Sequence, residues 1–367
     1  MPKRILIDAH QDIAYNMLTF ARDYRLAAGE TRQREIGTEI PLRNGHTLLG
    51  WPDYQYGQVA LIFATLFVMP QRYASATWET LVYHDLAQAG ELVRRQLDLY
   101  HRLSGDHSDQ FRLVLTRKNL DETLVTWESV PAAYPETTHP VGLVLSMESA
   151  EGIRNLEELE EFWERGLRWV GPVWAGWRFC GGMYEPGGFT GEGYELLERM
   201  AALGYGLDIA HMNGRSALQA LDAFPGPIIA SHANAQALLS GLDNERHLSD
   251  AVIRHLVERN GVMGVVPYNG FLRPGWRPGD NPQLVTLDLL ANHIDYICQI
   301  AGSARHVALG TDFDGGFGYG AVPVEINTIA DLQKLDGLLA GRGYSDEEIT
   351  AIFSGNWRRQ LERVLPP

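Results

Sequence analysis

The sequence predicts a single (β/α)8 barrel, or TIM barrel, covering residues 1–367. Short runs rich in Val, Ile and Leu alternate with amphipathic stretches, which is the pattern of βα units in a mostly parallel sheet. A chain of 367 residues lies within the size range of barrels that form one domain. Several apolar runs are followed by His, Asp or Glu, at the strand ends where barrels carry their functional residues.

Nine apolar runs are candidate strands, one more than the eight places of a closed barrel. They are 5–7, 59–68, 111–116, 141–147, 167–170, 206–209, 227–230, 262–266 and 307–310. The composition of the runs alone does not decide which of them lies outside the barrel.

The stretches between these runs carry helix start signals. Asn155 with Glu158 three residues later predicts the start of a helix over "NLEELEEFWERG". Ser249 predicts the start of a second helix, and Ser345 with Glu348 forms a capping-box pattern near the C-terminus. We interpret the histidines within the predicted helices as surface or interface residues; they are His84, His101, His255 and His293.

Residues 20–57 fit no βα unit. We expect this segment to be a loop with some helix that lies over the barrel mouth. The chain contains no internal repeat and no low-complexity tract, and no composition shift marks a domain boundary, so one domain is predicted.

Charge and hydropathy exclude several function classes. The net charge is −15 and no basic stripe occurs, which argues against nucleic acid and anionic membrane surfaces as partners. No apolar run approaches the ~20 residues of a membrane span, and the N-terminus lacks the apolar stretch of a signal peptide. The two cysteines, Cys180 and Cys298, provide no disulfide framework. We therefore expect a cytoplasmic enzyme.

Residues able to bind metal end or follow five of the candidate strands. They are His10 and Asp12, Glu148, His211, His232 and Asp312. In a parallel barrel the C-terminal ends of all strands meet at one rim, so these side chains converge although they span 300 positions of the chain. Imidazoles and carboxylates in this number suit one or two divalent metal ions, and zinc fits the ligand set best.

Six segments, taken in order, resemble the motifs of one protein family. They are "DAHQD" (D-G-H-N-D in the family), "SMESAEGI" (a strand ending in Glu), "LDIAHMN" (D-L-S-H), "SHANAQAL" (S-H-S-x-A-x-A-L), "NERHLSDAVI" (R-N-x-x-D) and "LGTDFDGG" (G-x-D-F-D-G). The chain is similar to the membrane (renal-type) dipeptidases, peptidase family M19 of the amidohydrolase-like superfamily of metal-dependent hydrolases. The resemblance implies that the run 111–116 lies outside the barrel.

The resemblance implies two zinc ions (Zn2+) per chain, a small-molecule substrate and a homodimer. Glu148 would bridge the ions, with His10 and Asp12 on one ion and His211 and His232 on the other. Two metals ~3.5–4 Å apart need an anionic bridge, and a hydroxide held between them is a nucleophile at neutral pH. None of the three lysines ends a predicted barrel strand, so a carboxylated lysine is a poorer bridge than Glu148.

Two further residues receive roles. Asp312 would take the proton of the attacking hydroxide and pass it to the departing amine; the alternative is a carboxylate that caps the next turn. We interpret Asp314 and Gly315 as turn residues. By resemblance Arg246 binds the terminal carboxylate of the substrate, a task that suits a planar bidentate donor. The alternative is an exposed loop arginine.

One residue departs from the family pattern. In the family, the segment that matches "GLRWVGPVWAGW" ends in a histidine that contacts the scissile carbonyl, and Trp174 occupies that place here. An indole N–H donates one hydrogen bond but carries no positive charge, so oxyanion stabilisation would be weaker. Trp174 with Trp169, Trp177 and Phe179 either walls an apolar substrate pocket or packs between barrel and helices.

Three hypotheses follow. The first is a zinc-dependent dipeptidase that hydrolyses the amide bond of dipeptides through a metal-bridging hydroxide. The second keeps the binuclear site but acts on another small amide, an acyl-amino acid or a lactone, because of Trp174. The third is a non-catalytic ligand-binding barrel, which a missing metal ligand or a missing Asp312 would indicate. Since these residues are all present, we rank it last.

Overall fold

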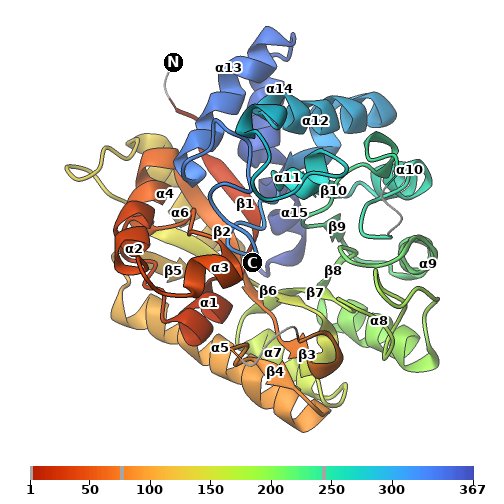
Figure 1. Cartoon of the computed structure of the whole chain (residues 1–367). Coiled ribbons are helices and arrows are strands. Elements are labelled where there is room, and N and C mark those ends of the chain that lie inside the picture. Colours follow the sequence, from red (N-terminus) through yellow and green to blue (C-terminus); the bar gives the residue numbers. More distant parts are fainter. Residues whose placement is uncertain (1–2, 75–77, 242–244) are drawn as a thin grey trace.

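Eight parallel strands form the ring at the centre of the computed structural model, which describes residues 3–74, 78–241 and 245–367. Their order is β1-β2-β6-β7-β8-β9-β10-β11, and helices surround them (Figure 1). The bounds are β1 Leu6–Gln11, β2 Val59–Leu66, β6 Val141–Glu148, β7 Leu167–Gly171, β8 Gly206–Asp208, β9 Ile228–Ala230, β10 Val262–Val265 and β11 Val307–Leu309. The predicted (β/α)8 fold is confirmed.

The ring closes between β11 and β1. Gln11 forms a parallel bridge with Phe313 just beyond β11. The buried carboxylate of Asp8 accepts hydrogen bonds from the backbone N–H and the hydroxyl of Thr311, at 2.7 and 2.6 Å. This contact ties the first strand to the loop that follows the last one.

The ninth predicted strand lies off the ring. β5 (Phe111–Leu113) pairs with the first residues of β6, whereas β7 pairs with the last ones. β2 pairs with β6 along most of the opposite edge of β6. β5 and β7 therefore both pair with the remaining edge of β6, one after the other. The run 111–116 is therefore outside the barrel, as the resemblance implied.

The helices are α1 Ile13–Phe20, α2 Ala28–Arg34, α3 Ile40–Asn44, α4 Trp51–Gly57, α5 Leu86–Asp106, α6 Arg117–Ser129, α7 Glu158–Glu164, α8 Gly191–Leu203, α9 Gly214–Ala223, α10 Asp250–Glu258, α11 Asn269–Leu272, α12 Leu287–Ala301, α13 Lys334–Gly341, α14 Asp346–Thr350 and α15 Asn356–Val364. A π-helical turn, Ala351–Gly355, joins α14 to α15. A further pair of two-residue strands, β3 Met69–Pro70 and β4 Val82–Tyr83, lies apart from the ring. The apolar faces of the ring and the helices form one continuous core.

Two of the three predicted helix starts are confirmed. The Ser249 hydroxyl accepts from the backbone N–H of the third residue of α10, and Ser345 with Glu348 forms the capping box of α14. The predicted start at Asn155 is wrong by three residues, since α7 begins at Glu158. The Glu158 carboxylate instead accepts hydrogen bonds from the backbone N–H and the Nε of Arg154, at 3.0 and 2.6 Å. The Glu158 carboxylate is therefore not available to accept a hydrogen bond from the backbone N–H of Asn155, as a capping box would require.

The segment 20–57 contains three helices, α2 to α4, and so more helix than expected. α3 lies beside α1 in front of the strand ring in Figure 1. Arg43 and Asn44 of α3 line the cavity described below. This part of the segment lies at the barrel mouth, as predicted.

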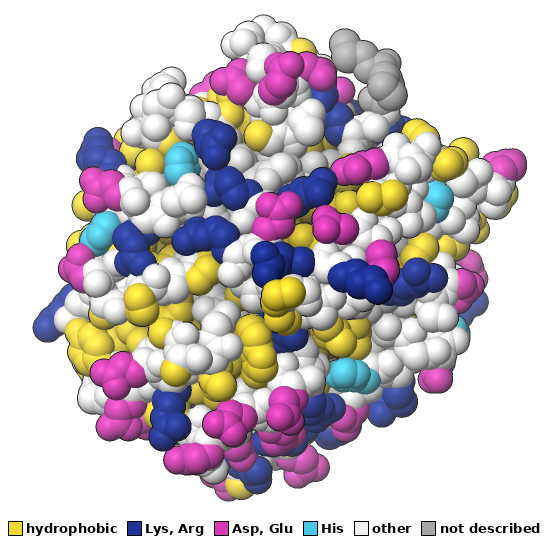
Figure 2. Space-filling model, turned by 180° about the vertical axis from the view of Figure 1, so that it is seen from behind, with side chains coloured by type: hydrophobic (Ala, Val, Ile, Leu, Met, Phe, Trp, Pro, Cys, Tyr) yellow, Lys and Arg dark blue, Asp and Glu magenta, His cyan; other side chains and the backbone are white. Residues whose placement is uncertain are grey.

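The surface seen from behind has no uniformly basic area. Figure 2 shows Lys and Arg side chains interspersed with Asp and Glu on that face. Within the described ranges, no helix is both long and apolar enough to cross a membrane.

Candidate metal centre and active-site cavity

The sequence-predicted ligands lie together at the C-terminal ends of the strands. His10 belongs to β1 and Glu148 ends β6, so regular strand backbone positions both side chains. The others follow β1, β8, β9 and β11 directly; they are Asp12, His211, His232 and Asp312. His211 and Asp312 have positive φ angles of 65° and 56°. Such backbone costs free energy in a non-glycine residue and occurs often at functional sites.

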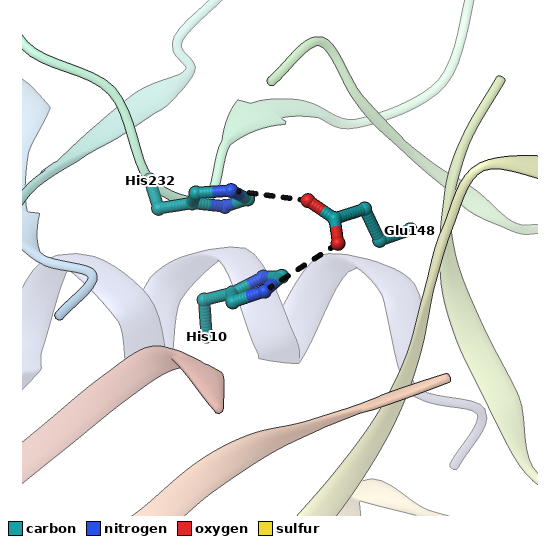
Figure 3. A group of neighbouring side chains, drawn as sticks. All are labelled: His10, Glu148 and His232. Carbon is teal, nitrogen blue, oxygen red and sulfur yellow. Dashed lines mark ion pairs between the residues drawn. The ribbon is translucent and has the colours of Figure 1, made fainter. Parts of the chain in front are cut away.

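The two carboxylate oxygens of Glu148 face different groups of ligands (Figure 3). Oε1 lies 2.5 Å from Nε2 of His211 and 3.3 Å from Nε2 of His232. Oε2 lies 4.0 Å from Nε2 of His10. One carboxylate thus stands between two sets of donors, which is the arrangement a bridging ligand requires.

The second set surrounds His10. Its Nε2 lies 3.7 Å from Oδ2 of Asp12 and 3.8 Å from Oδ1 of Asp312. The donor atoms of His10, Glu148 and His232 lie within 4.8 Å of one another, and so do those of His10, Asp12 and Asp312. These two groups share His10, and each is compact enough to hold one metal ion.

Unsatisfied buried atoms support a cation at this place. Nε2 of His10 and Oδ1 of Asp12 are buried and have no hydrogen-bond partner among the described residues. Leaving a buried polar atom unpaired costs about 1–3 kcal/mol. Nε2 of His211 and Nε2 of His232 also face each other at 2.8 Å. Imidazole nitrogens and carboxylate oxygens aimed at shared points fit zinc or a similar divalent ion.

All three imidazoles have a neighbouring side chain on the second ring nitrogen. Nδ1 of His10 lies 3.4 Å from the hydroxyl of Thr65. Nδ1 of His232 lies 2.7 Å from the hydroxyl of Ser231, and Nδ1 of His211 lies 3.3 Å from Sδ of Met183. A partner on the second ring nitrogen orients a histidine toward a metal. The neighbouring Asn234 binds the backbone of Val266 and Phe271 instead.

The pKa values of the cluster follow from burial and neighbouring charges. Burial lowers the pKa of His211 and His232 well below the ordinary value, so both imidazoles are neutral at pH 7. Burial also lowers the pKa of His10, but nearby carboxylates, Glu148 foremost, outweigh it and raise this pKa to about 10. Burial raises the pKa of Asp312 to about 7 and that of Glu148 well above its usual range. A divalent cation would displace these protons when it binds.

A cavity of about 400 Å³ opens onto the cluster. Asp12, Glu148, His211 and Asp312 are part of its lining. Its size is that of a small-ligand site.

Arg246 lines the same cavity and is only 4% exposed. Its Nη1 donates to the backbone carbonyl of His232 at 3.0 Å, and its guanidinium lies 5.3 Å from the centre of the Phe271 ring. Burial lowers the pKa of Arg246. The interpretation as an exposed loop arginine is therefore wrong, and a carboxylate in the cavity could reach this cation.

The four aromatic residues in β7 and in the segment after it have different environments. Trp174 alone among them lines the cavity, with its ring centre 6.2 Å from that of His211. Trp169 and Phe179 are buried in the core, and Trp177 is 50% exposed. Trp174 thus fits the alternative of a pocket wall, whereas Trp169 and Phe179 fit the alternative of packing, because neighbouring positions of one chain segment point in different directions.

Asp314 is more than a turn residue. It is 1% exposed, and its carboxylate accepts hydrogen bonds from Arg22, Tyr24, Thr47 and the backbone N–H of Leu48. It therefore fastens the segment 20–57 to the loop that carries Asp312. The sequence contained no signal for this role, because Arg22 lies 292 residues away.

Apart from Trp174, the apolar and aromatic residues of the lining were not predicted from the sequence; they are Tyr15, Phe67, Met69, Trp78, Met183, Tyr184 and Phe271. Phe67 lies at the end of the predicted strand 59–68, so the strand-end rule that selected His10 could have found it. The loop residues Met183 and Tyr184 carry no comparable signal.

The sequence matches one protein family over nearly its whole length. Residues 1–365 match the family described as "Membrane dipeptidase (Peptidase family M19)". A Klebsiella pneumoniae protein encoded in the region 5′ of pqqA is 33% identical over 235 residues, covering 61% of this chain and 82% of that protein. Dipeptidase aclJ of Aspergillus oryzae is 23% identical, covering 98% of this chain and 78% of that protein.

Among solved structures, a metallopeptidase from Rhodobacter sphaeroides has the same fold, with a TM-score of 0.77 and 21% identity over 99% of both chains. That protein is liganded with a phosphinate mimic of the dipeptide L-Ala-D-Ala. The family match covers nearly the whole chain, and the ligand types that such an enzyme needs meet at one cavity. The chain therefore belongs to the membrane dipeptidase family, peptidase family M19, and is a metal-dependent hydrolase of the dipeptidase type.

Proposed function

We propose that this protein is a zinc-dependent dipeptidase with two zinc ions per chain. The observation that carries the proposal is the position of Glu148, whose two oxygens face His10 on one side and His211 with His232 on the other. Asp12 joins the His10 side. When bound, the two ions would polarise the scissile carbonyl and lower the pKa of a water molecule to near neutrality.

The residues around the ions divide the remaining tasks. Asp312 accepts a proton from the attacking water and returns it to the amine as the C–N bond breaks, which leaves an amino acid with a free carboxylate and one with a free amine. In support of this role, Asp312 lines the cavity, and its Oδ1 lies 3.8 Å from Nε2 of His10. Arg246 binds the terminal carboxylate, since its planar cation faces the same cavity.

Trp174 changes the chemistry of one wall of the cavity. Its ring borders the cavity near His211, and its single N–H can donate only one hydrogen bond. The carbonyl oxygen of the substrate then depends more heavily on the metal ions for stabilisation. This dependence fits a dipeptidase and does not require a different bond to be cleaved.

The experiment that tests this function combines metal analysis with turnover. We expect about two zinc per chain in protein purified with zinc present, and hydrolysis of simple dipeptides. His10→Ala should lower the metal content by about one ion and reduce kcat at least 1,000-fold, in the range seen for lost catalytic groups.

A matched control is available within the chain. His107 and Asp109 repeat the His-x-Asp spacing of His10 and Asp12, but they lie at the end of α5, away from the cluster. His107→Ala should leave both zinc content and turnover unchanged. Zinc-loaded protein that hydrolyses no dipeptide would contradict the proposed function. The homodimer and the cytoplasmic location stay predictions, which sedimentation velocity and cell fractionation would test.

A further inference from the structure

The two ends of the cavity lie on opposite sides of the barrel mouth. Arg246 follows β9, whereas Phe67 follows β2. These strands are four places apart in the ring of eight, so they face each other across the barrel. Glu148 ends β6 and Asp312 follows β11, and these two strands lie on the two opposite arcs of the ring that join β2 to β9.

A continuous aromatic wall, which includes Phe67 after β2, lines the cavity. It consists of Tyr15, Phe67, Trp174 and Tyr184, all of which line the cavity. The ring centres of Tyr15 and Phe67 are 5.7 Å apart, and the ring of Trp174 lies 5.4 Å from those of Phe67 and Tyr184.

Tyr73 supports this wall. Its ring stacks on Tyr184 at 5.0 Å and meets Trp174 edge-on at 5.9 Å. Edge-to-face and offset contacts at these distances stabilise aromatic pairs and fix their orientation. The wall is therefore a preformed apolar surface, and Met69 and Met183 line the same cavity.

This layout assigns a direction to a bound dipeptide, if the proposed function holds. A carboxylate on Arg246 places the C-terminal residue on the β9 side, and the scissile amide then lies over Glu148 and Asp312. The N-terminal residue extends toward β2 and meets the aromatic wall. We propose that the wall selects dipeptides whose N-terminal residue carries a bulky apolar side chain, above all an aromatic one, with Trp174 as the main specificity-determining residue.

A cationic side chain is the competing occupant of this surface. Aromatic faces attract ammonium groups, and Glu79 lines the same cavity. However, the rings pack against one another and do not form a cage around a position for an ammonium group. Such a packed wall presents a broad apolar surface, which a neutral ring covers better than a cation does. The wall therefore favours a neutral ring.

The test compares four dipeptides with the zinc-loaded enzyme: Phe-Gly, Ala-Gly, Lys-Gly and Gly-Phe. We expect kcat/KM for Phe-Gly to exceed that for each of the other three at least tenfold, since burying a larger apolar group gives discrimination of this order. Trp174→Ala and the half-exposed Tyr184→Ala should each reduce the ratio of Phe-Gly to Ala-Gly to below threefold. Trp174→Phe should keep an intermediate ratio. Trp177→Ala is the matched control, because this tryptophan lies outside the lining, and its ratio should equal that of the wild type.

Binding separates this inference from the proposed function. Calorimetry with phosphinate mimics of Phe-Gly and Ala-Gly should give Kd values at least tenfold apart in the wild type and nearly equal in Trp174→Ala. Turnover of all four dipeptides at similar rates, or a preference for Lys-Gly or Gly-Phe, would overturn the inference and leave the dipeptidase assignment intact. Absent turnover together with a tenfold preference for the Phe-Gly mimic would overturn the dipeptidase assignment alone. Equal Kd values of the wild type for the two mimics would overturn the selection by the wall, whatever the turnover.

Discussion

Replacing Asp314 by asparagine tests whether this buried carboxylate fastens the segment 20–57 to the barrel. Its Oδ2 accepts from the hydroxyl of Tyr24 at 2.8 Å, from Nη1 of Arg22 at 3.2 Å and from the hydroxyl of Thr47. Its Oδ1 accepts from the backbone N–H of Leu48 at 2.8 Å. Four donors thus converge on a side chain that has only acceptors.

The size of the effect follows from this donor count. An asparagine has one oxygen and one NH2 group, so in either orientation the NH2 group faces a donor. If the oxygen stays beside Arg22, the fixed N–H of Leu48 loses its acceptor, which costs about 1–3 kcal/mol. The buried Arg22 also loses one of its two charged partners and keeps only Glu35. Breaking a buried ion pair costs about 3–5 kcal/mol, and we expect a total loss in that range.

Urea unfolding of the zinc-loaded enzyme measures this loss as the change in the free energy of unfolding. Asp23→Asn is the matched control, since Asp23 pairs with Arg25 on the partly exposed surface of the same segment and should contribute less than about 1 kcal/mol. A loss below about 1 kcal/mol in Asp314→Asn would refute the reasoning, because it would mean that the buried donors find other partners at little cost.

Three further predictions concern pH, metal and substrate. Burial lowers the pKa of His293, which is 1% exposed, to about 4. The neutral imidazole therefore contributes its full stabilisation above pH 6.5, and this contribution is lost as the pH falls toward 4. The difference in unfolding free energy between wild type and His293→Gln should shift by about 2 kcal/mol between pH 8 and pH 5, and a constant difference would contradict it. Dialysis against a chelator should lower Tm and abolish dipeptide hydrolysis, with both restored by added zinc; an unchanged Tm would speak against a bound metal. Arg246→Lys should raise KM for a dipeptide about tenfold with a smaller change in kcat, because lysine cannot bind a carboxylate through two parallel hydrogen bonds; an unchanged KM would exclude this contact.

The metal cluster was predictable from the sequence because a simple rule links strand ends to one place. His10, Glu148 and Asp312 belong to distant parts of the chain, but each belongs to or follows an apolar run that reads as a buried strand. In a parallel barrel, backbone hydrogen bonding forces the C-terminal ends of such runs to one rim. Recognising the runs was therefore enough to predict that these side chains meet.

The burial and direction of other side chains depend on partners that local pattern does not identify. Trp169 and Trp174 lie five residues apart, yet one stacks in the core on Phe63 and the other borders the cavity. His293, interpreted as a surface or interface residue, is buried and accepts from the backbone N–H of Ala235.

The same limit applies to the anchoring of the barrel mouth. Asp314 meets its donors only because the segment 20–57 folds back onto the last βα loop. Apolar periodicity reports whether a position faces a core, but it carries no information on which distant residue lies there. The strands and the convergence of the candidate metal ligands therefore follow from the sequence, whereas the aromatic wall and the Asp314 network follow from the packing of segments far apart in the chain.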